Sequence, residues 1–173
     1  MLRILRRIAV NGTLTEAPPA TEDTELEALG IEVRRTLEVR FSGSLAIRQV
    51  DAGSCNGCEL EIHALNNPYY DVERFGVHFV ASPRHADALL VTGPVSRHME
   101  NALRRTWRAM PSPKLVIAAG ECACSGGIFG ASYASCGSVD QVIPVDVRIP
   151  GCPPTPKVLL QGLLAALRTE QSP

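Results

Sequence analysis

Four cysteines stand in three segments that lie far apart in the sequence and are rich in glycine or proline. Cys55 and Cys58 belong to Cys-Asn-Gly-Cys-Glu, Cys122 to Gly-Glu-Cys-Ala, and Cys152 to Pro-Gly-Cys-Pro-Pro. Two thiols separated by two residues can grip one face of a metal cluster, and glycine leaves room for a bulky inorganic core beside the backbone. We therefore expect the four thiols to meet at one site.

The composition is that of a soluble globular domain. The chain has 173 residues, of which 45% are hydrophobic and 20% charged, which is enough to bury a sizeable core. A formal net charge of -1 provides no basic field for nucleic acid, so nucleic acid is not an expected partner. No apolar stretch approaches the roughly 18 residues of a membrane span, and the N-terminus lacks a secretory signal. A cytoplasmic location is expected, where the cysteines stay reduced.

Strand-like and helix-like segments alternate along the chain. Apolar runs predict strands at 45–50, 77–81, 88–92, 114–119 and 142–147, and helical patterns cover 59–65, 96–110 and 154–168. This alternation predicts a doubly wound, mostly parallel α/β sheet. Ligands of such sheets bind at the carboxyl ends of the strands, and Cys55, Cys122 and Cys152 each follow an expected strand closely.

Residues 1–44 are expected to form an N-terminal extension, and residues 45–173 the folded domain. Residues 11–24 have the composition of a flexible link. Within residues 1–10, Arg3, Arg6 and Arg7 alternate with leucine and isoleucine. A basic amphipathic helix of this kind fits an anionic membrane or an integral subunit, and a frayed terminus is the alternative.

The residues alone leave three interpretations of the cysteines open. An iron-sulfur cluster is favoured because one close pair is completed by two isolated thiols far downstream. A structural zinc site usually takes two compact pairs, although four cysteines satisfy zinc's tetrahedral preference. A redox-active dithiol of the thioredoxin type is the third interpretation, and it leaves Cys122 and Cys152 unexplained.

Further motifs give the chain a resemblance to a known family. They are Asp-Val-Glu-Arg-Phe-Gly at 71–76, Ser-Pro-Arg-His-Ala-Asp at 82–87, Ser-Gly-Gly at 125–127, and the stretch from Val-Ile-Pro-Val-Asp at 142–146 to Gly-Cys-Pro-Pro-Thr-Pro at 151–156. With the cysteine motifs, they make residues 48–167 resemble the small subunit of membrane-associated, energy-converting NiFe hydrogenases of the formate hydrogenlyase type. The resemblance to the 20 kDa subunit of respiratory NADH:quinone oxidoreductase is more distant.

The resemblance implies a flavodoxin-like domain with one 4Fe-4S cluster held by Cys55, Cys58, Cys122 and Cys152. It also implies an electron relay between the NiFe centre of a separate large subunit and a ferredoxin-like iron-sulfur subunit. Integral membrane subunits would hold this complex at the cytoplasmic face of the membrane. Cys124 and Cys136 have no ligand role in the family pattern, although Cys124 is close enough to Cys122 in sequence to compete for the same iron.

Glu59 directly follows the second cysteine and is the candidate for moving a proton near the cluster. The alternative is an acidic residue stabilised by a helix N-terminus. The quinone-reductase relatives carry two adjacent cysteines where this chain has Cys-x-x-Cys-Glu, which favours the hydrogenase branch. A subunit that relays electrons to quinone remains the second candidate function.

Overall fold

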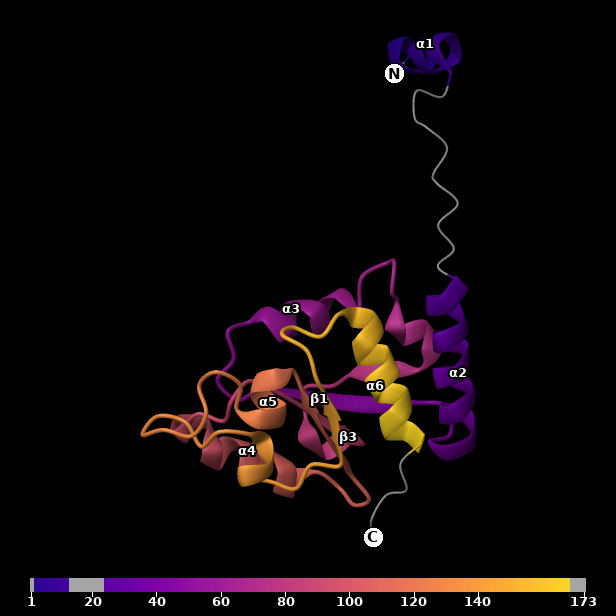
Figure 1. The fold of residues 1–173 in the computed structure, drawn as a ribbon. Helices are drawn as coiled ribbons and strands as arrows, with labels where there is room; N and C mark the ends of the chain where they lie inside the picture. The colour runs from indigo at the N-terminus through magenta and orange to yellow at the C-terminus, as the bar shows by residue number, and fades with distance from the viewer. Residues whose placement is uncertain (1, 13–23, 169–173) are drawn as a thin grey trace.

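A single parallel β-sheet forms the centre of the protein, in a computed structural model that describes residues 2–12 and 24–168 (Figure 1). Its strands are β1 (Leu45–Asp51), β2 (Val77–Phe79), β3 (Ala88–Thr92), β4 (Leu115–Ala119) and β5 (Val147–Ile149). They lie in the order β2-β1-β3-β4-β5, and every neighbouring pair is parallel. This is the order of flavodoxin-like sheets, so the predicted α/β fold class is confirmed.

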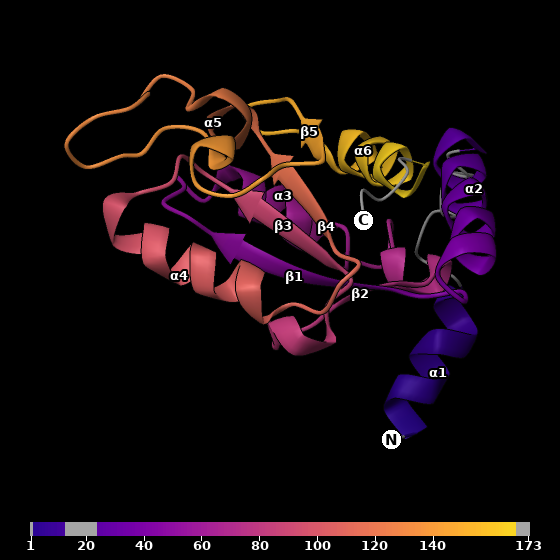
Figure 2. The same ribbon diagram turned by 90° about the horizontal axis from the view of Figure 1, so that it is seen from below.

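Helices cover both faces of the sheet (Figure 2). The α-helices are α1 (Leu2–Asn11), α2 (Thr24–Arg40), α3 (Gly57–Ala64), α4 (Arg97–Ala109), α5 (Glu121–Ser125) and α6 (Pro156–Arg168). Three short 3-10 helices, η1 (Val72–Phe75), η2 (Pro83–His85) and η3 (Val139–Gln141), lie in the connections. The expected helices at 59–65, 96–110 and 154–168 correspond to α3, α4 and α6.

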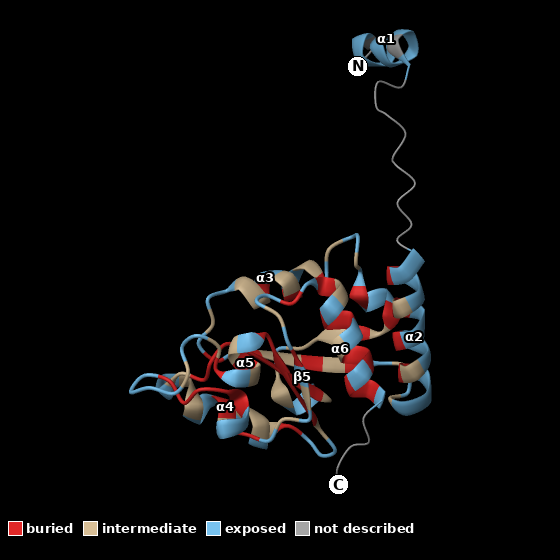
Figure 3. Ribbon diagram, in the orientation of Figure 1, coloured by how far each residue is buried: buried red, intermediate tan, exposed pale blue. Residues whose placement is uncertain are grey.

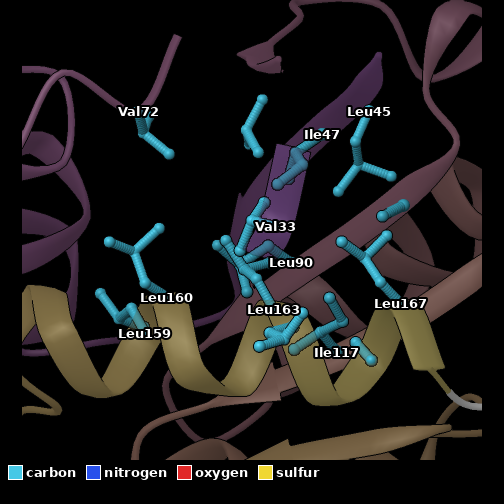
Figure 4. Packing of buried hydrophobic residues seen from close by; sticks show 14 of the residues in the cluster. Val33, Leu45, Ile47, Val72, Leu90, Ile117, Leu159, Leu160, Leu163 and Leu167 are labelled. Atoms are coloured by element: carbon cyan, nitrogen blue, oxygen red, sulfur yellow. The ribbon is translucent and has the colours of Figure 1, made fainter. Parts of the chain in front are cut away.

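The sheet is buried on both faces, which explains its continuous apolar strands. In β4, Ile117 packs toward α2, α3 and α6, whereas its neighbours Val116 and Ala118 join the cluster beneath α4 and α5. Successive strand residues point to opposite faces, so a strand covered on both sides is apolar at every position. Figure 4 shows Ile117, Leu90 and Ile47 of the first cluster against the leucines of α6.

Helix α2 belongs to the same core, although its residues fall within the expected extension. Leu26, Val33 and Leu37 are buried on it, and they pack in the cluster that includes α6. Val33 is labelled in the view of this cluster in Figure 4. At Gly30 a Cβ atom would lie 2.2 Å from the Phe75 ring, so the helix also approaches η1 closely. The folded part therefore includes Thr24–Arg40 and does not begin near Leu45. The sequence indicated this helix only by a narrow row of apolar residues between charged ones.

The strand expected at 142–147 is the one element that was placed wrongly. Val142 and Ile143 are buried, but they lie in irregular chain after η3, and β5 occupies Val147–Ile149. Pro144 has no N–H to donate to a sheet, and Asp146 instead accepts a 2.7 Å hydrogen bond from the backbone N–H of Val116 through its carboxylate. The apolar run thus reflects burial beneath α4 rather than strand pairing.

The N-terminal residues 2–11 form helix α1, and residues 3–10 are all exposed (Figure 3). Most of the expected link at 11–24 lies outside the described residues. Within the described ranges, no helix is long and apolar enough to cross a membrane.

Candidate metal centre

The four cysteines of the sequence motifs line one cavity at the carboxyl ends of the strands. Its volume is about 40 Å³, roughly three times the space that a single water requires. The lining residues come from the connections after β1, β3, β4 and β5, and they are Ser54, Cys55, Gly57, Cys58, Gly93, Glu121, Cys122, Gly151, Cys152 and Pro153. Residues almost a hundred positions apart in sequence thus meet at the edge expected for a ligand site.

Cys55 and Cys58 are positioned by the turn between β1 and α3. Asp51, the last residue of β1, accepts 2.8 Å hydrogen bonds from the backbone N–H groups of Gly53 and Ser54. Ser54 then accepts a 3.1 Å hydrogen bond from the N–H of Asn56 through its hydroxyl. Asn56 takes the left-handed conformation, with φ of 71°, and α3 begins immediately after it. Cys55 therefore precedes the helix, and Cys58 lies in its first turn.

Cys122 and Cys152 are brought together by hydrogen bonds between the segments that follow β4 and β5. The N–H of Gly120 donates to the carbonyl of Ile149, and the N–H of Glu121 donates to the carbonyl of Gly151, both at 2.8 Å. Cys122 is the second residue of α5, and Cys152 directly follows Gly151. The two thiols therefore reach the same cavity although their segments belong to different strands.

Burial and the closeness of the four thiols make Cys58 and Cys122 harder to deprotonate. Burial, followed by the negative charges of Glu59 and of the other three thiolates, raises the pKa of Cys58 to about 11. Burial also raises the pKa of Cys122, with further contributions from Cys152 and Cys55. Four thiolates in one cavity repel each other, and a cationic metal would remove this repulsion and favour deprotonation.

The backbone around the thiols leaves space that a side chain would fill. A Cβ atom on Gly120 would lie 2.5 Å from the Sγ of Cys58, and one on Gly127 would lie 2.9 Å from the Sγ of Cys122. Gly93, which belongs to none of the sequence motifs, packs so closely on Ser54 that a Cβ atom there would lie 2.6 Å from the backbone nitrogen of Ser54. Its signal was a Gly-Pro pair after an apolar strand. The four thiols, together with the space left by Gly120 and Gly127, fit a compact inorganic cluster.

No set of three or more His, Cys, Asp or Glu side chains within residues 2–12 and 24–168 converges on the position of a single metal ion. The four thiols surround a volume instead. All six cysteines are free thiols.

Cys124 and Cys136 lie away from the cavity. The thiol of Cys124 donates toward the carbonyls of Ala118 at 3.5 Å and Ile149 at 3.6 Å, and burial raises its pKa to about 11. The thiol of Cys136 donates to the Glu100 carboxylate at 3.4 Å. Cys136 is buried and Cys124 is partly buried, and neither residue lines the cavity.

Glu59 is buried in the first turn of α3, with 6% of its surface exposed. Neither carboxylate oxygen has a hydrogen-bond partner among the described residues. Such a group is costly to bury unless water or another polar group satisfies it. By contrast Glu121, which precedes Cys122, is exposed and accepts a 2.6 Å hydrogen bond from the Ser125 hydroxyl.

Comparison with known proteins identifies the family of the chain. Residues 55–166, more than half of the sequence, match the family described as NADH ubiquinone oxidoreductase, 20 Kd subunit. The chain belongs to this family. The match begins at Cys55 and includes all four cavity cysteines.

Members of the family named as hydrogenase and as quinone-reductase subunits are both similar to the chain. Formate hydrogenlyase subunit 7 of Escherichia coli K12 is 46% identical over 86% of the chain and 57% of its own length. The probable membrane-bound hydrogenase subunit mbhJ of Pyrococcus furiosus is 50% identical over 68% of the chain and 71% of its own length. An NADH-quinone oxidoreductase subunit of Desulfovibrio desulfuricans is 50% identical over 62% of the chain and 58% of its own length. The chain thus spans little more than half the length of some relatives.

Solved structures agree with the fold. A chain of the membrane-bound sulfane sulfur reductase, an archaeal respiratory membrane complex, aligns with a TM-score of 0.64 and 34% identity over 79% of this chain and 74% of its own. A chain of an NAD+-reducing NiFe hydrogenase aligns with a TM-score of 0.56 and 21% identity over 75% of this chain and 94% of its own, which supports the fold alone.

Proposed function

We propose that the chain is the electron-transfer subunit of a NiFe hydrogenase complex and carries one 4Fe-4S cluster on Cys55, Cys58, Cys122 and Cys152. In this role it relays electrons between the NiFe centre of a large subunit and a ferredoxin-like iron-sulfur subunit. The observation that carries the proposal is the meeting of four free thiols from three distant motifs in one glycine-lined cavity. Relatives named as hydrogenase subunits support it.

The bound cluster would supply reversible one-electron transfer at a potential that its protein surroundings tune. The chain contributes four thiolates, of which Cys58 and Cys122 are partly buried while Cys55 and Cys152 are exposed. Soft thiolates favour iron-sulfur clusters over hard cations. The exposed pair marks the side on which another subunit must exclude water.

Glu59 is proposed as a proton carrier beside the electron relay. Its carboxyl group is next in sequence to Cys58, is buried, and lacks a hydrogen-bond partner among the described residues. A general acid or base needs a titratable group that the fold has not already engaged. The helix-terminus alternative accounts for its position in α3 but not for its unpartnered oxygens.

A loop beside the cavity is the proposed docking surface for the large subunit. No charged residue occurs between Glu121 and Asp140, and Ile128, Phe129 and Tyr133 are 94%, 57% and 98% exposed. The loop follows α5 and projects from the body in Figures 1 and 2. The centres of protein interfaces are likewise poor in charge and rich in aromatic residues.

Backbone hydrogen bonds hold this loop in shape, including Gly130 N–H to Gly126 at 3.1 Å and Arg97 N–H to Ala134 at 2.9 Å. A preformed loop binds a partner without the entropy cost of ordering. The chain would then be a peripheral subunit that partner subunits hold at a membrane complex, as the names of mbhJ and of the sulfur reductase imply for those relatives.

The proposal is tested by metal analysis of the purified complex. We expect about four irons and four acid-labile sulfides per copy of the chain, nickel in the large subunit, and reduction of a viologen dye with hydrogen. Serine at any of the four cavity cysteines should remove the cluster's electron paramagnetic resonance signal. Stoichiometric zinc in place of iron would reject the cluster.

A quinone-reductase-type subunit is the second candidate, and the similarity to the NADH-quinone oxidoreductase subunit of Desulfovibrio desulfuricans favours it. The two candidates differ in the large subunit and in the electron acceptor. An active complex that lacks nickel and is inhibited by quinone analogues would establish this second function and reject the hydrogenase assignment.

A further inference from the structure

Helix α1 separates positive charge from apolar surface. At 100° per residue, Arg3, Arg6 and Arg7 fall within one third of the helix circumference. Ile4, Leu5 and Ile8 fall within another third, on nearly the opposite side. The helix contains no acidic residue, and the first one in the chain is Glu16. A chain with a net charge of -1 therefore concentrates positive charge at this helix.

No other residue in the part of the chain that the structure describes covers the apolar side of α1. Ile4, Leu5 and Ile8 are 64%, 59% and 61% exposed. Figure 3 shows residues 3–10 of α1 as exposed. A helix of 10 residues is marginal by itself in water, because helices shorter than about 12 residues rarely offset the cost of nucleation. This helix needs a surface to pack on.

The charges decide which kind of surface fits. Arginine is the only charged residue type on the helix, and an anionic lipid surface attracts every arginine beside it, by about 1 kcal/mol each. At about 15 Å, ten helical residues are too short to span a bilayer but long enough to lie along one. A helix with arginines on one side and isoleucine and leucine on the other suits the boundary between headgroups and acyl chains.

We propose that α1 binds directly to an anionic membrane surface, with Ile4, Leu5 and Ile8 inserted among the lipids and Arg3, Arg6 and Arg7 at the phosphates. This contact is additional to any attachment through partner subunits. It does not depend on the proposed electron-transfer role, because none of these residues belongs to the cavity.

Sedimentation with lipid vesicles tests the proposal. The purified complex of the full chain with its water-soluble partner subunits is mixed with vesicles of phosphatidylcholine alone, or of phosphatidylcholine with phosphatidylglycerol. We expect binding to the anionic vesicles only, weakened by salt. Changing Arg3, Arg6 and Arg7 together to Gln should lower the affinity about fivefold per charge, or roughly a hundredfold. Changing Ile4, Leu5 and Ile8 to Ser should also abolish binding.

A matched control separates a local site from a general charge effect. Arg35, Arg105 and Arg108 are exposed on the folded domain, and their joint change to Gln removes the same charge. This control should bind anionic vesicles like the unchanged complex, and iron content should be equal in all variants. The proposal is overturned if the unchanged complex ignores anionic vesicles or binds neutral ones equally. Equal loss in the control triple would also overturn it, as would α1 variants that bind anionic vesicles as tightly as the unchanged complex.

Discussion

The Sγ atom of Cys58 lies 2.5 Å from the position that a Cβ atom would occupy on Gly120. These residues belong to the connections after β1 and β4, so the absence of a side chain on one strand end makes room for a thiol from another. Gly120 also has φ of +90°, which L-residues with a side chain rarely adopt. Both properties make this glycine part of the candidate metal centre.

Alanine at Gly120 should displace the Cys58 thiol and reduce the iron content of the protein severely. Gly43→Ala is the matched control, because Gly43 has φ of +89° and a Cβ atom added there would have nothing within 4 Å. Both variants carry similar backbone strain, of about 1 kcal/mol or more. Only the first places an atom against a cavity thiol. Equal iron content in the two purified variants would show that the Gly120–Cys58 approach is unimportant for the cluster.

Cys124→Ala should leave the cluster intact, although Cys124 is separated from Cys122 by one residue. Its thiol points to the carbonyls of Ala118 and Ile149 and does not line the cavity. Iron content and the paramagnetic resonance spectrum should match those of the unchanged protein, whereas Cys122→Ala loses both. The reverse pattern would transfer the third ligand position to Cys124.

Glu59→Gln should slow hydrogen turnover by about 100-fold while preserving the cluster spectrum. The amide keeps the shape of the side chain but cannot carry a proton, and general acid-base groups contribute about this much or more. Glu121→Gln is the control, since it also neutralises a carboxylate beside a cavity cysteine but at an exposed position. Hydrogen turnover is measured for both variants, and we expect a loss only in Glu59→Gln. Unchanged turnover in Glu59→Gln would leave Glu59 with only a helix-terminus role.

Replacing Ile128, Phe129 and Tyr133 together by Ser should weaken assembly with the large subunit. All three side chains are exposed in the isolated chain, so the change removes apolar contact area without disturbing the core. Co-purification of the large subunit should fall, with little effect on the thermal stability of the chain itself. Val39 and Ile31 are also exposed but lie on α2, and serine at both is the control. Undiminished assembly of the loop variant would exclude this loop as the docking surface.

Val33→Ala should destabilise the domain by about 2 kcal/mol, because it removes buried methyl groups from α2. Val39→Ala makes the same change on the same helix at a position that is 81% exposed, compared with 0% for Val33, and should change stability by less than about 0.5 kcal/mol. In thermal unfolding, the first variant should melt about 4–8 °C lower. Similar melting of the two variants would mean that α2 is not part of the cooperative domain.

Much of the fold could be predicted from the sequence, because a strand that is buried on both faces of the sheet is apolar at every position. Strands such as Ala88–Thr92 were found by that pattern, and their alternation with helices gave the fold class. The same apolar pattern wrongly predicted a strand at 142–147, because a buried loop can be as apolar as a strand. Helix α2 was missed for the opposite reason, because only a narrow row of its residues is buried among charged ones.

The sequence by itself determined which thiols carry recognisable motifs, since glycine, proline and cysteine at fixed spacings are local features. It could not determine that Gly93 and Gly120 yield space to Ser54 and Cys58, or that both carboxylate oxygens of Glu59 are buried without partners among the described residues. These properties depend on distances between strand ends that only the assembled sheet sets. Local chemistry chose the candidate ligands, and the order of the parallel strands brought them to one cavity, because neighbouring strands end at the same edge.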